Sequence, residues 1–183
     1  MKERFEYFLN AVHYCLYLGE IWSNRIMEKG FSKILYGLSR VFSFERFYER
    51  AMKRYRNDNG LDEYMYGKNY GQSIGLTHHW FGLFYSGYSA FLSFVLLGFV
   101  FKVCGKTDYL IIVLTVLIPI GLCYIPAYKA VLSKDRYLKF FKQFEKESEQ
   151  WHKKWRRTTI AFCIGAVITA LSGIIAMWII LLL

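Results

Sequence analysis

The sequence has little that would break helices or cross-link the chain, because its 183 residues include only 2 Pro and 4 Cys. The cysteines are scattered and match no metal-ligand or disulfide spacing, which excludes a disulfide scaffold; they are Cys15, Cys104, Cys123 and Cys163. Low-complexity tracts are also absent, and hydrophobic residues reach 55%. A disordered or collagen-like chain is therefore excluded.

Charge is missing from three long stretches, at about 81–101, 109–128 and 159–183. Each reaches the roughly 20 apolar residues that a helix needs to cross a bilayer. A segment inside lipid must be helical, because every backbone N–H needs a partner there. The sequence therefore predicts an all-α, polytopic membrane protein with a transmembrane hairpin at 81–128 and a C-terminal transmembrane helix at 159–183. A soluble core of three buried helices is disfavoured by three such spans in one small chain.

The hairpin has a short connection and an interrupted second helix. Residues 102–108 leave room only for an antiparallel turn, which Gly105 is suited to form. Pro119 and Pro126 each remove a backbone donor, so we expect a kink or local unwinding near them.

Lys and Arg are distributed unevenly along the chain. Residues 1–80 contain 12, the hairpin connection contains 2, and residues 129–158 contain 10. By the positive-inside rule, 1–80 and 129–158 are predicted to be cytoplasmic, with the hairpin tip and the C-terminus on the opposite side. A compact chain without a cleavable leader favours a bacterial inner membrane.

The N-terminal region, 1–80, shows helical periodicity. Apolar residues at steps of three and four predict one helix over about 3–29, which Gly30 ends, and a second over about 32–56. In the second helix we expect an inward face, made of Leu35, Leu38, Val41, Phe42 and Met52. A Gly- and Tyr-rich loop is predicted at 57–77.

Within 129–158 the sequence predicts an amphipathic helix over 134–157. Its aromatic stripe contains Tyr137, Phe140, Phe141, Phe144, Ser148, Trp151 and Trp155. Such a stripe can lie on anionic lipid, but packing against the N-terminal helices is favoured because their apolar faces also need cover. Basic and aromatic residues suited to the membrane interface are Trp80, Trp151, Lys153, Lys154, Trp155, Arg156 and Arg157.

Small residues recur at helix-packing spacing within the predicted spans. They are Ser86, Ala90 and Gly98 in the first span and Ala161, Gly165, Thr169 and Gly173 in the third. Small residues four apart let helix backbones approach closely, which drives association in lipid. We expect these residues to pack helices within the chain and to support a homo-oligomer or a membrane-protein complex.

Residues that would carry catalysis are scarce. No phosphate loop, nucleophile elbow or zinc motif is present, and no ionisable residue lies within a predicted span, which argues against pumps, ion-coupled carriers and intramembrane hydrolases. His78, His79 and His152 are weak metal candidates; anchoring at the interface beside Trp80 is the favoured role. No cofactor or catalytic residue is predicted. The net charge of +10 follows from the membrane flanks, so nucleic-acid binding is not expected.

The sequence leaves three functions open. The first is a non-enzymatic integral membrane protein that associates through its spans and binds a partner with its cytoplasmic helices, as an anchor or complex subunit. The second is a self-assembling pore or channel-type effector. The third, and the least favoured, is a membrane-surface enzyme that uses the histidines.

Overall fold

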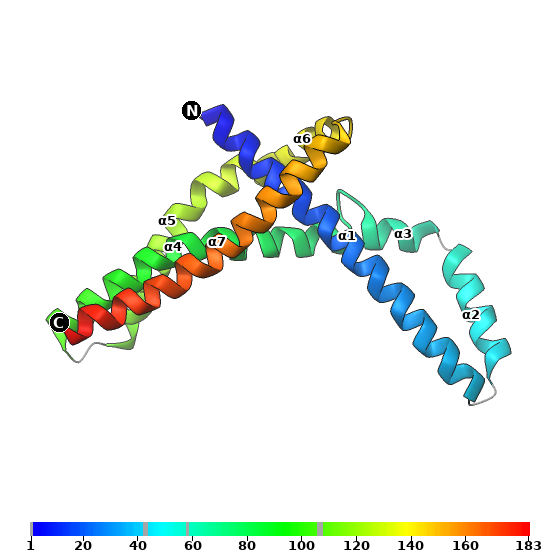
Figure 1. Cartoon of the computed structure of the whole chain (residues 1–183), viewed down its shortest axis with the longest axis horizontal. Helices are drawn as coiled ribbons and strands as arrows, with labels where there is room; N and C mark the ends of the chain where they lie inside the picture. Colours follow the sequence, from blue (N-terminus) through cyan, green and yellow to red (C-terminus); the bar gives the residue numbers. More distant parts are fainter. Residues whose placement is uncertain (1, 42–43, 58, 106–107) are drawn as a thin grey trace. The chain divides into compact units, whose positions relative to one another are not determined.

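The computed structural model describes residues 2–41, 44–57, 59–105 and 108–183, and over these residues the chain is all-helical, as predicted (Figure 1). The elements, in chain order, are α1 (Lys2–Val41), α2 (Glu45–Asn57), α3 (Asn59–Tyr66), α4 (Gln72–Cys104), α5 (Tyr109–Val131), the 3-10 turn η1 (Ser133–Asp135), α6 (Arg136–Phe144) and α7 (Glu149–Leu182).

The chain forms two compact units. We call Met1–Cys15 together with His78–Leu183 the aromatic unit, and Leu16–Thr77 the hairpin unit. The hairpin unit is a different region from the predicted transmembrane hairpin at 81–128, which belongs to the aromatic unit. α1 and α4 each contribute a segment to both units, so the boundary falls inside continuous helices.

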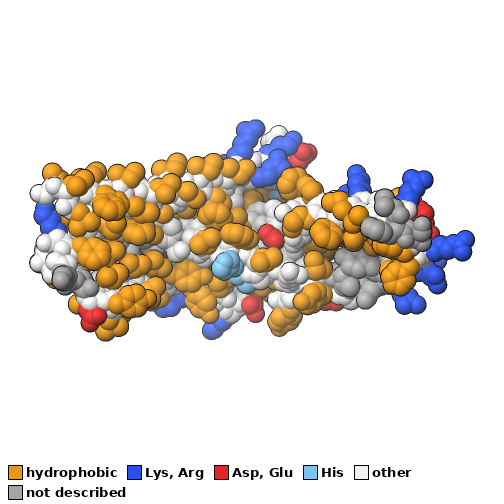
Figure 2. Space-filling model, turned by 90° about the horizontal axis from the view of Figure 1, so that it is seen from below, with side chains coloured by type: hydrophobic (Ala, Val, Ile, Leu, Met, Phe, Trp, Pro, Cys, Tyr) orange, Lys and Arg blue, Asp and Glu red, His pale blue; other side chains and the backbone are white. Residues whose placement is uncertain are grey.

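Three helical segments of the structure are long and apolar enough to cross a membrane. They are Gln72–Cys104, Tyr109–Phe144 and Glu149–Leu182, with mean hydropathies of 1.8, 2.5 and 2.4 over their most apolar stretches. Figure 2 shows hydrophobic side chains covering much of the face that these helices present. The prediction of three spans of suitable length and composition is confirmed.

Contacts between these helices show their relative directions. Gly87 lies against Ala166, and Gly98 lies against Met177, so α4 and α7 run in the same direction. α5 runs opposite to α4, because Ser93 of α4 donates to the carbonyl of Val116 at 2.9 Å, while Gly82, earlier in α4, contacts Tyr124.

The connection between α4 and α5 fits the expected turn. Gly105 has a φ of 64°, a conformation that glycine adopts without steric cost. Lys106 and Thr107 of the predicted connection lie outside the described residues. α5 is helical through both Pro119 and Pro126, so local unwinding is not found.

The predicted break at Gly30 is wrong, because α1 continues as one helix to Val41. One glycine costs a helix about 1 kcal/mol relative to alanine, which does not end a helix that has no capping contact there. Leu35 and Leu38, expected to face inward, are 41% and 44% exposed. The predicted inward side chains of Val41 and Phe42 lie outside the described residues.

The predicted loop at 57–77 is also largely helical. α3 occupies Asn59–Tyr66, and α4 begins at Gln72, well before the predicted start of the first span. Asp58 lies outside the described residues. Only a short turn around Gly67–Gly71 remains, where a Cβ on either glycine would collide with backbone atoms, so this turn requires glycine.

The helix predicted over 134–157 is interrupted twice. Ser133–Asp135 form a tight turn in which Lys134 and Asp135 adopt left-handed conformations, and α6 ends at Phe144. α7 begins at Glu149 behind Ser148, whose hydroxyl accepts from the backbone N–H of Trp151 at 3.3 Å. Ser148 is thus an N-cap rather than part of a continuous stripe.

Within the hairpin unit, α2 and α3 pack on α1 through tyrosine hydroxyls. Tyr48 of α2 donates to the carbonyl of Ser32 at 2.8 Å, and Tyr36 donates to Glu45 at 2.8 Å. Tyr17 donates to the carbonyl of Tyr66 at 2.7 Å. These contacts lie on one side of α1, so its opposite side is left open within the unit.

Candidate functional site

The centre of the aromatic unit is a segment of α1 that is buried on every side. All seven residues from Leu9 to Cys15 are at most 8% exposed, although only one face of this helix was predicted to be covered. A helix buried all round must be enclosed by other elements. Here the enclosing side chains come from α4, α6 and α7, and most of them are aromatic.

The aromatic stripe of α6 and early α7 packs against this segment of α1. Tyr14 contacts the ring of Phe141 at a centroid distance of 5.0 Å, edge to face. Tyr7 contacts Phe144 at 5.3 Å and accepts a hydrogen bond from the indole N–H of Trp151 at 2.9 Å. The expected packing of the stripe on the N-terminal helix is therefore observed, and it gives aromatic pairs in the favoured edge-on geometry.

Two histidines from distant parts of the sequence meet inside this cluster. Nε2 of His13 lies 2.9 Å from Nδ1 of His78, and the two rings stack at 5.0 Å. His13 is fully buried, with Phe81 and Tyr137 packed edge-on against its ring. One ring nitrogen donates to the other, which requires that at least one of these two nitrogens be unprotonated.

Burial, and then the neighbouring His78, hold the pKa of His13 well below its usual range. His13 is therefore neutral near pH 7. Nδ1 of His13 and Oδ1 of Asn10, three residues apart on α1, are both buried without a protein hydrogen-bond partner. Burial also raises the pKa of the Cys15 thiol to about 11, so Cys15 is not a nucleophile at neutral pH.

The histidines predicted as metal candidates do not come together. His78 pairs with His13, which the sequence analysis did not single out. His152 lies beside Tyr14 and Trp151, and exposed His79 contacts Trp80 at 5.9 Å. Over the described ranges, no three His, Cys, Asp or Glu side chains are arranged to hold a metal ion.

The residues predicted for the membrane interface divide into two groups. Trp151 and Trp155 are half-buried against α1, whereas Trp80 is 40% exposed and stacks on Phe84. The four cations of early α7 are exposed; they are Lys153, Lys154, Arg156 and Arg157. Lys153 pairs with Glu149 at 2.8 Å.

Several of the small residues predicted for helix packing lie where α4 and α7 approach. A Cβ added to Gly173 would lie 2.7 Å from the Cα of Phe91, and one added to Gly98 would lie 3.2 Å from the Cα of Met177. Gly165 faces the hydroxyl of Tyr88. Ala90 and Thr169 are half-buried and Ala161 is exposed. Helices inside lipid gain no hydrophobic free energy by associating, so van der Waals contact between closely approaching backbones is one of the interactions that hold such helices together.

One contact in this interface was not predicted from the sequence. Gly87 packs on Ala166, which is 1% exposed and belongs to the row beside the predicted one. Tyr88 adds a hydrogen bond to the carbonyl of Phe162 at 2.7 Å.

Three hydroxyls within the long apolar helices form hydrogen bonds inside the chain. Ser93 is fully buried and donates across to α5, and Ser86 and Thr115 donate to their own helices at the carbonyls of Leu83 and Ile111. A pore assembled from several copies would need polar side chains on an outer face. The hydroxyls of Ser86, Ser93 and Thr115 each donate to a backbone carbonyl; Ser93 is buried, and Ser86 and Thr115 are partly exposed.

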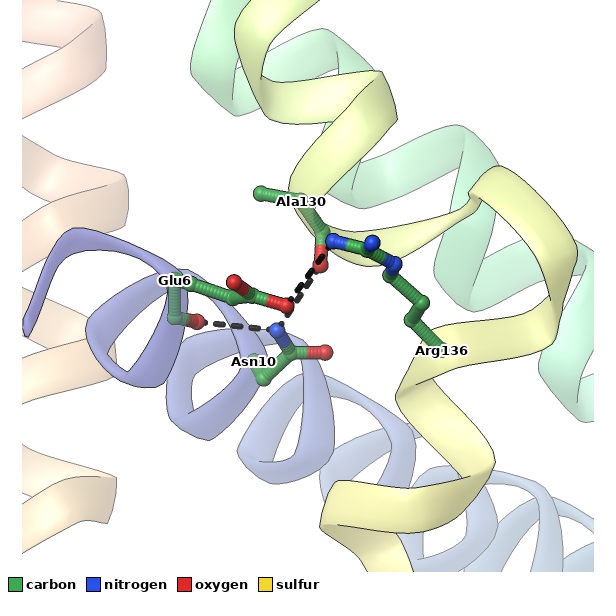
Figure 3. Close-up of polar contacts among 4 residues, drawn as sticks. All are labelled: Glu6, Asn10, Ala130 and Arg136. Carbon is green, nitrogen blue, oxygen red and sulfur yellow. Dashed lines mark hydrogen bonds and ion pairs between the residues drawn. The ribbon is translucent and has the colours of Figure 1, made fainter. Parts of the chain in front are cut away.

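A polar contact joins the N-terminal turns of α1 to the junction of α5 and α6. The side-chain amide of Asn10 donates to the carbonyls of Glu6 and Ala130, at 2.8 and 3.1 Å. The carboxylate of Glu6 pairs with Arg136 at 3.2 Å (Figure 3). These contacts fix α1 beside the point where α5 ends.

No family model, curated protein or solved structure matches this chain.

Proposed function

We propose that this chain is a non-enzymatic integral membrane protein that crosses the bilayer three times, through α4, α5 and α7, and binds a partner protein with its hairpin unit. The observation that carries the proposal is the apolar surface left exposed both on the three long helices and on α1 of the hairpin unit. A soluble protein rarely leaves such extended apolar surface exposed without a binding role.

In the three long helices the outward side chains are large and apolar. Examples are Leu92, Leu117, Ile118, Leu122, Ile168 and Ile175, each 47% exposed or more. Small and aromatic residues fill the inner contacts between the helices. Hydrocarbon would cover the outer surface, and the closely approaching backbones would hold the helices together.

The sidedness of the proposal follows from charge. Residues 1–80 and 129–158 carry nearly all Lys and Arg, and the positive-inside rule supports a cytoplasmic location for both, for example at a bacterial inner membrane. Cys104 would then lie at the opposite side. In intact cells, a membrane-impermeant maleimide should label Cys104, and the label should be lost in Cys104→Ser. Labelling that survives this substitution, or that requires permeabilised cells, would contradict this topology.

In the hairpin unit, an open apolar face on α1 supports the partner-binding role. We call it the Met27–Leu38 face; its residues are Met27, Phe31, Ile34, Leu35 and Leu38, 41–67% exposed. They recur at i, i+4, i+7, i+8 and i+11, the pattern of a helix that lies in an apolar groove of another protein. Lys29, Lys33 and Arg40 lie on the opposite side of the helix.

Site-specific photo-cross-linking tests this face in the full chain in its own membrane. A benzophenone side chain at Phe31 should give a protein adduct of one defined mass. The same group at Lys33, on the opposite side of α1, should give none and serves as the matched control. Adducts with lipid alone would assign the face to the membrane surface, and adducts with the chain itself would assign it to a homo-oligomer; either result would refute the proposed partner.

A further inference from the structure

An open pocket of about 540 Å³ lies where α5 ends and α6 begins, beside the first turns of α1. Its charged lining residues are Glu6, Lys129, Lys134 and Arg136. Its apolar lining includes Phe5, Ile125 and Pro126. The pocket thus combines a cationic part with an apolar wall.

The positive charge of this pocket is only partly compensated. Glu6 is paired with Arg136, at 3.2 Å. In the part of the chain that the structure describes, no carboxylate lies within ion-pair distance of Lys129 or Lys134, and both are exposed. Two unpaired ammonium groups and the Ser133 hydroxyl therefore line one concave surface.

The backbone holds Lys134 at this place in an unfavourable conformation. Lys134 and Asp135 have φ angles of 57° and 51°, the left-handed region that lysine seldom adopts. The two residues kink the chain between α5 and α6, and Lys134 lines the same pocket as Lys129 of the preceding helix. Unfavourable backbone of this kind is concentrated at ligand-binding positions in proteins.

The apolar wall continues along α5 away from the cations. Ile118, Leu122 and Ile125 follow one face of this helix and are 52%, 64% and 47% exposed. A ligand that fits both parts carries a phosphate and an acyl chain. A free phosphate would use only the cationic part.

We propose that this pocket binds an anionic phospholipid, with its phosphate between Lys129 and Lys134 and an acyl chain along Ile125 and α5. The inference rests on the proposed membrane crossing, which places the end of α5 at the level of lipid headgroups. Basic pockets at the cytoplasmic ends of transmembrane helices are suited to such headgroups.

Native mass spectrometry of the full chain in a neutral detergent tests the proposal. Phosphatidylglycerol should bind more tightly than phosphatidylcholine with the same acyl chains. Lys129→Gln with Lys134→Gln should weaken phosphatidylglycerol binding about 25-fold, since each lysine at a headgroup contributes a factor of about five. The matched control, Lys142→Gln with Lys146→Gln, removes the same charge from exposed positions that do not line the pocket and should change binding less than about twofold.

Equal losses in the two double variants would overturn the proposal, because they would show a general effect of charge. Equal binding of phosphatidylcholine would also overturn it. Displacement of phosphatidylglycerol by an equal concentration of inorganic phosphate would assign the pocket to a soluble anion instead.

Flotation of the chain with phosphatidylglycerol liposomes separates this inference from the proposed function. A chain that does not enter liposomes overturns both. If the chain enters liposomes, but the double variant Lys129→Gln with Lys134→Gln keeps the lipid preference of the wild type, only the proposed lipid binding at the pocket is overturned.

Discussion

The two units of this molecule are stabilised by different interactions. In the aromatic unit, Phe81, Phe141 and Phe144 are completely buried and surround one segment of α1. In the hairpin unit, the large apolar side chains of α1 point outward, and the helices are joined mainly through tyrosine hydroxyls. A fully buried Phe contributes about 1.5–3 kcal/mol, whereas a hydrogen bond contributes about 1 kcal/mol net. We therefore expect the hairpin unit to open first and to gain most from a partner.

The largest effect is expected from Phe141→Ala. This side chain contacts His13, Tyr14 and Tyr137, and its removal leaves a cavity at the centre of the aromatic unit, which should cost about 3–5 kcal/mol. Phe47→Ala in the hairpin unit, where Phe47 is 70% exposed, should cost less than about 0.5 kcal/mol. Denaturant unfolding in detergent micelles measures both. Similar losses in the two variants would remove the contrast between the units.

The next effect concerns the approach of α4 and α7. Gly173→Ala places a methyl group 2.7 Å from the Cα of Phe91, so the helices must separate, at a cost of about 1–3 kcal/mol. Gly121→Ala is the matched control, because a Cβ at Gly121 meets nothing within 4 Å. Thermal unfolding in micelles should show a lower midpoint for the first variant and an unchanged or slightly higher one for the second. A drop at Gly121 alone would show that the close contact at Gly173 is unimportant.

The histidine pair should make stability depend on pH. The folded-state pKa of His13 is depressed, so the unfolded chain binds the proton more tightly; stability is kept above about pH 6.5 and falls below it, by up to about 1.4 kcal/mol per pH unit. The titratable groups around the ring are His78 and Tyr137, with Asp135 acting on His78.

Unfolding midpoints between pH 7.5 and 5 measure this dependence. His13→Leu should flatten it, and His79→Gln, at an exposed position, should leave it unchanged. An unaltered slope in His13→Leu would show that another group is responsible.

The smallest effect is expected in the hairpin unit. Tyr48→Phe removes the hydroxyl that joins α2 to Ser32 and should cost about 1 kcal/mol, while Tyr36→Phe removes a contact at an exposed pair and should cost less. Hydrogen exchange of α2 should speed up in Tyr48→Phe, with no change in α5. Acceleration throughout the molecule would mean that the two units unfold together.

The long helices were predictable because absence of charge over some 20 residues is a local property of the sequence. The turn at Gly105 and the packing of the α6 stripe on α1 were predictable for a similar reason, since turn chemistry and an unpaired aromatic face are visible in short windows. Membrane crossing and sidedness remain predictions.

The histidine pair was not predictable, because His13 meets a partner 65 residues away while the sequence draws attention to the adjacent His78 and His79. The break before α7 does have a local sequence signal, because Ser148 precedes Glu149, a usual start of a helix. Small residues lie on more than one face of α7, and the sequence does not show which of them contact α4. Ala166 and Gly173 do so because they meet Gly87 and Phe91, which only the tertiary structure reveals.

The enclosed segment of α1 has a consequence for biosynthesis. Leu9–Cys15 are translated before the rings that surround them, which belong to α4, α6 and α7. Trp151, for example, bonds to Tyr7 across 144 residues of later sequence. Until α7 has been translated, this stretch has no complete lining. The first turns of α1 therefore reach their final place only after Trp151 has been translated, and a nascent chain released before that point leaves them open to premature association or proteolysis.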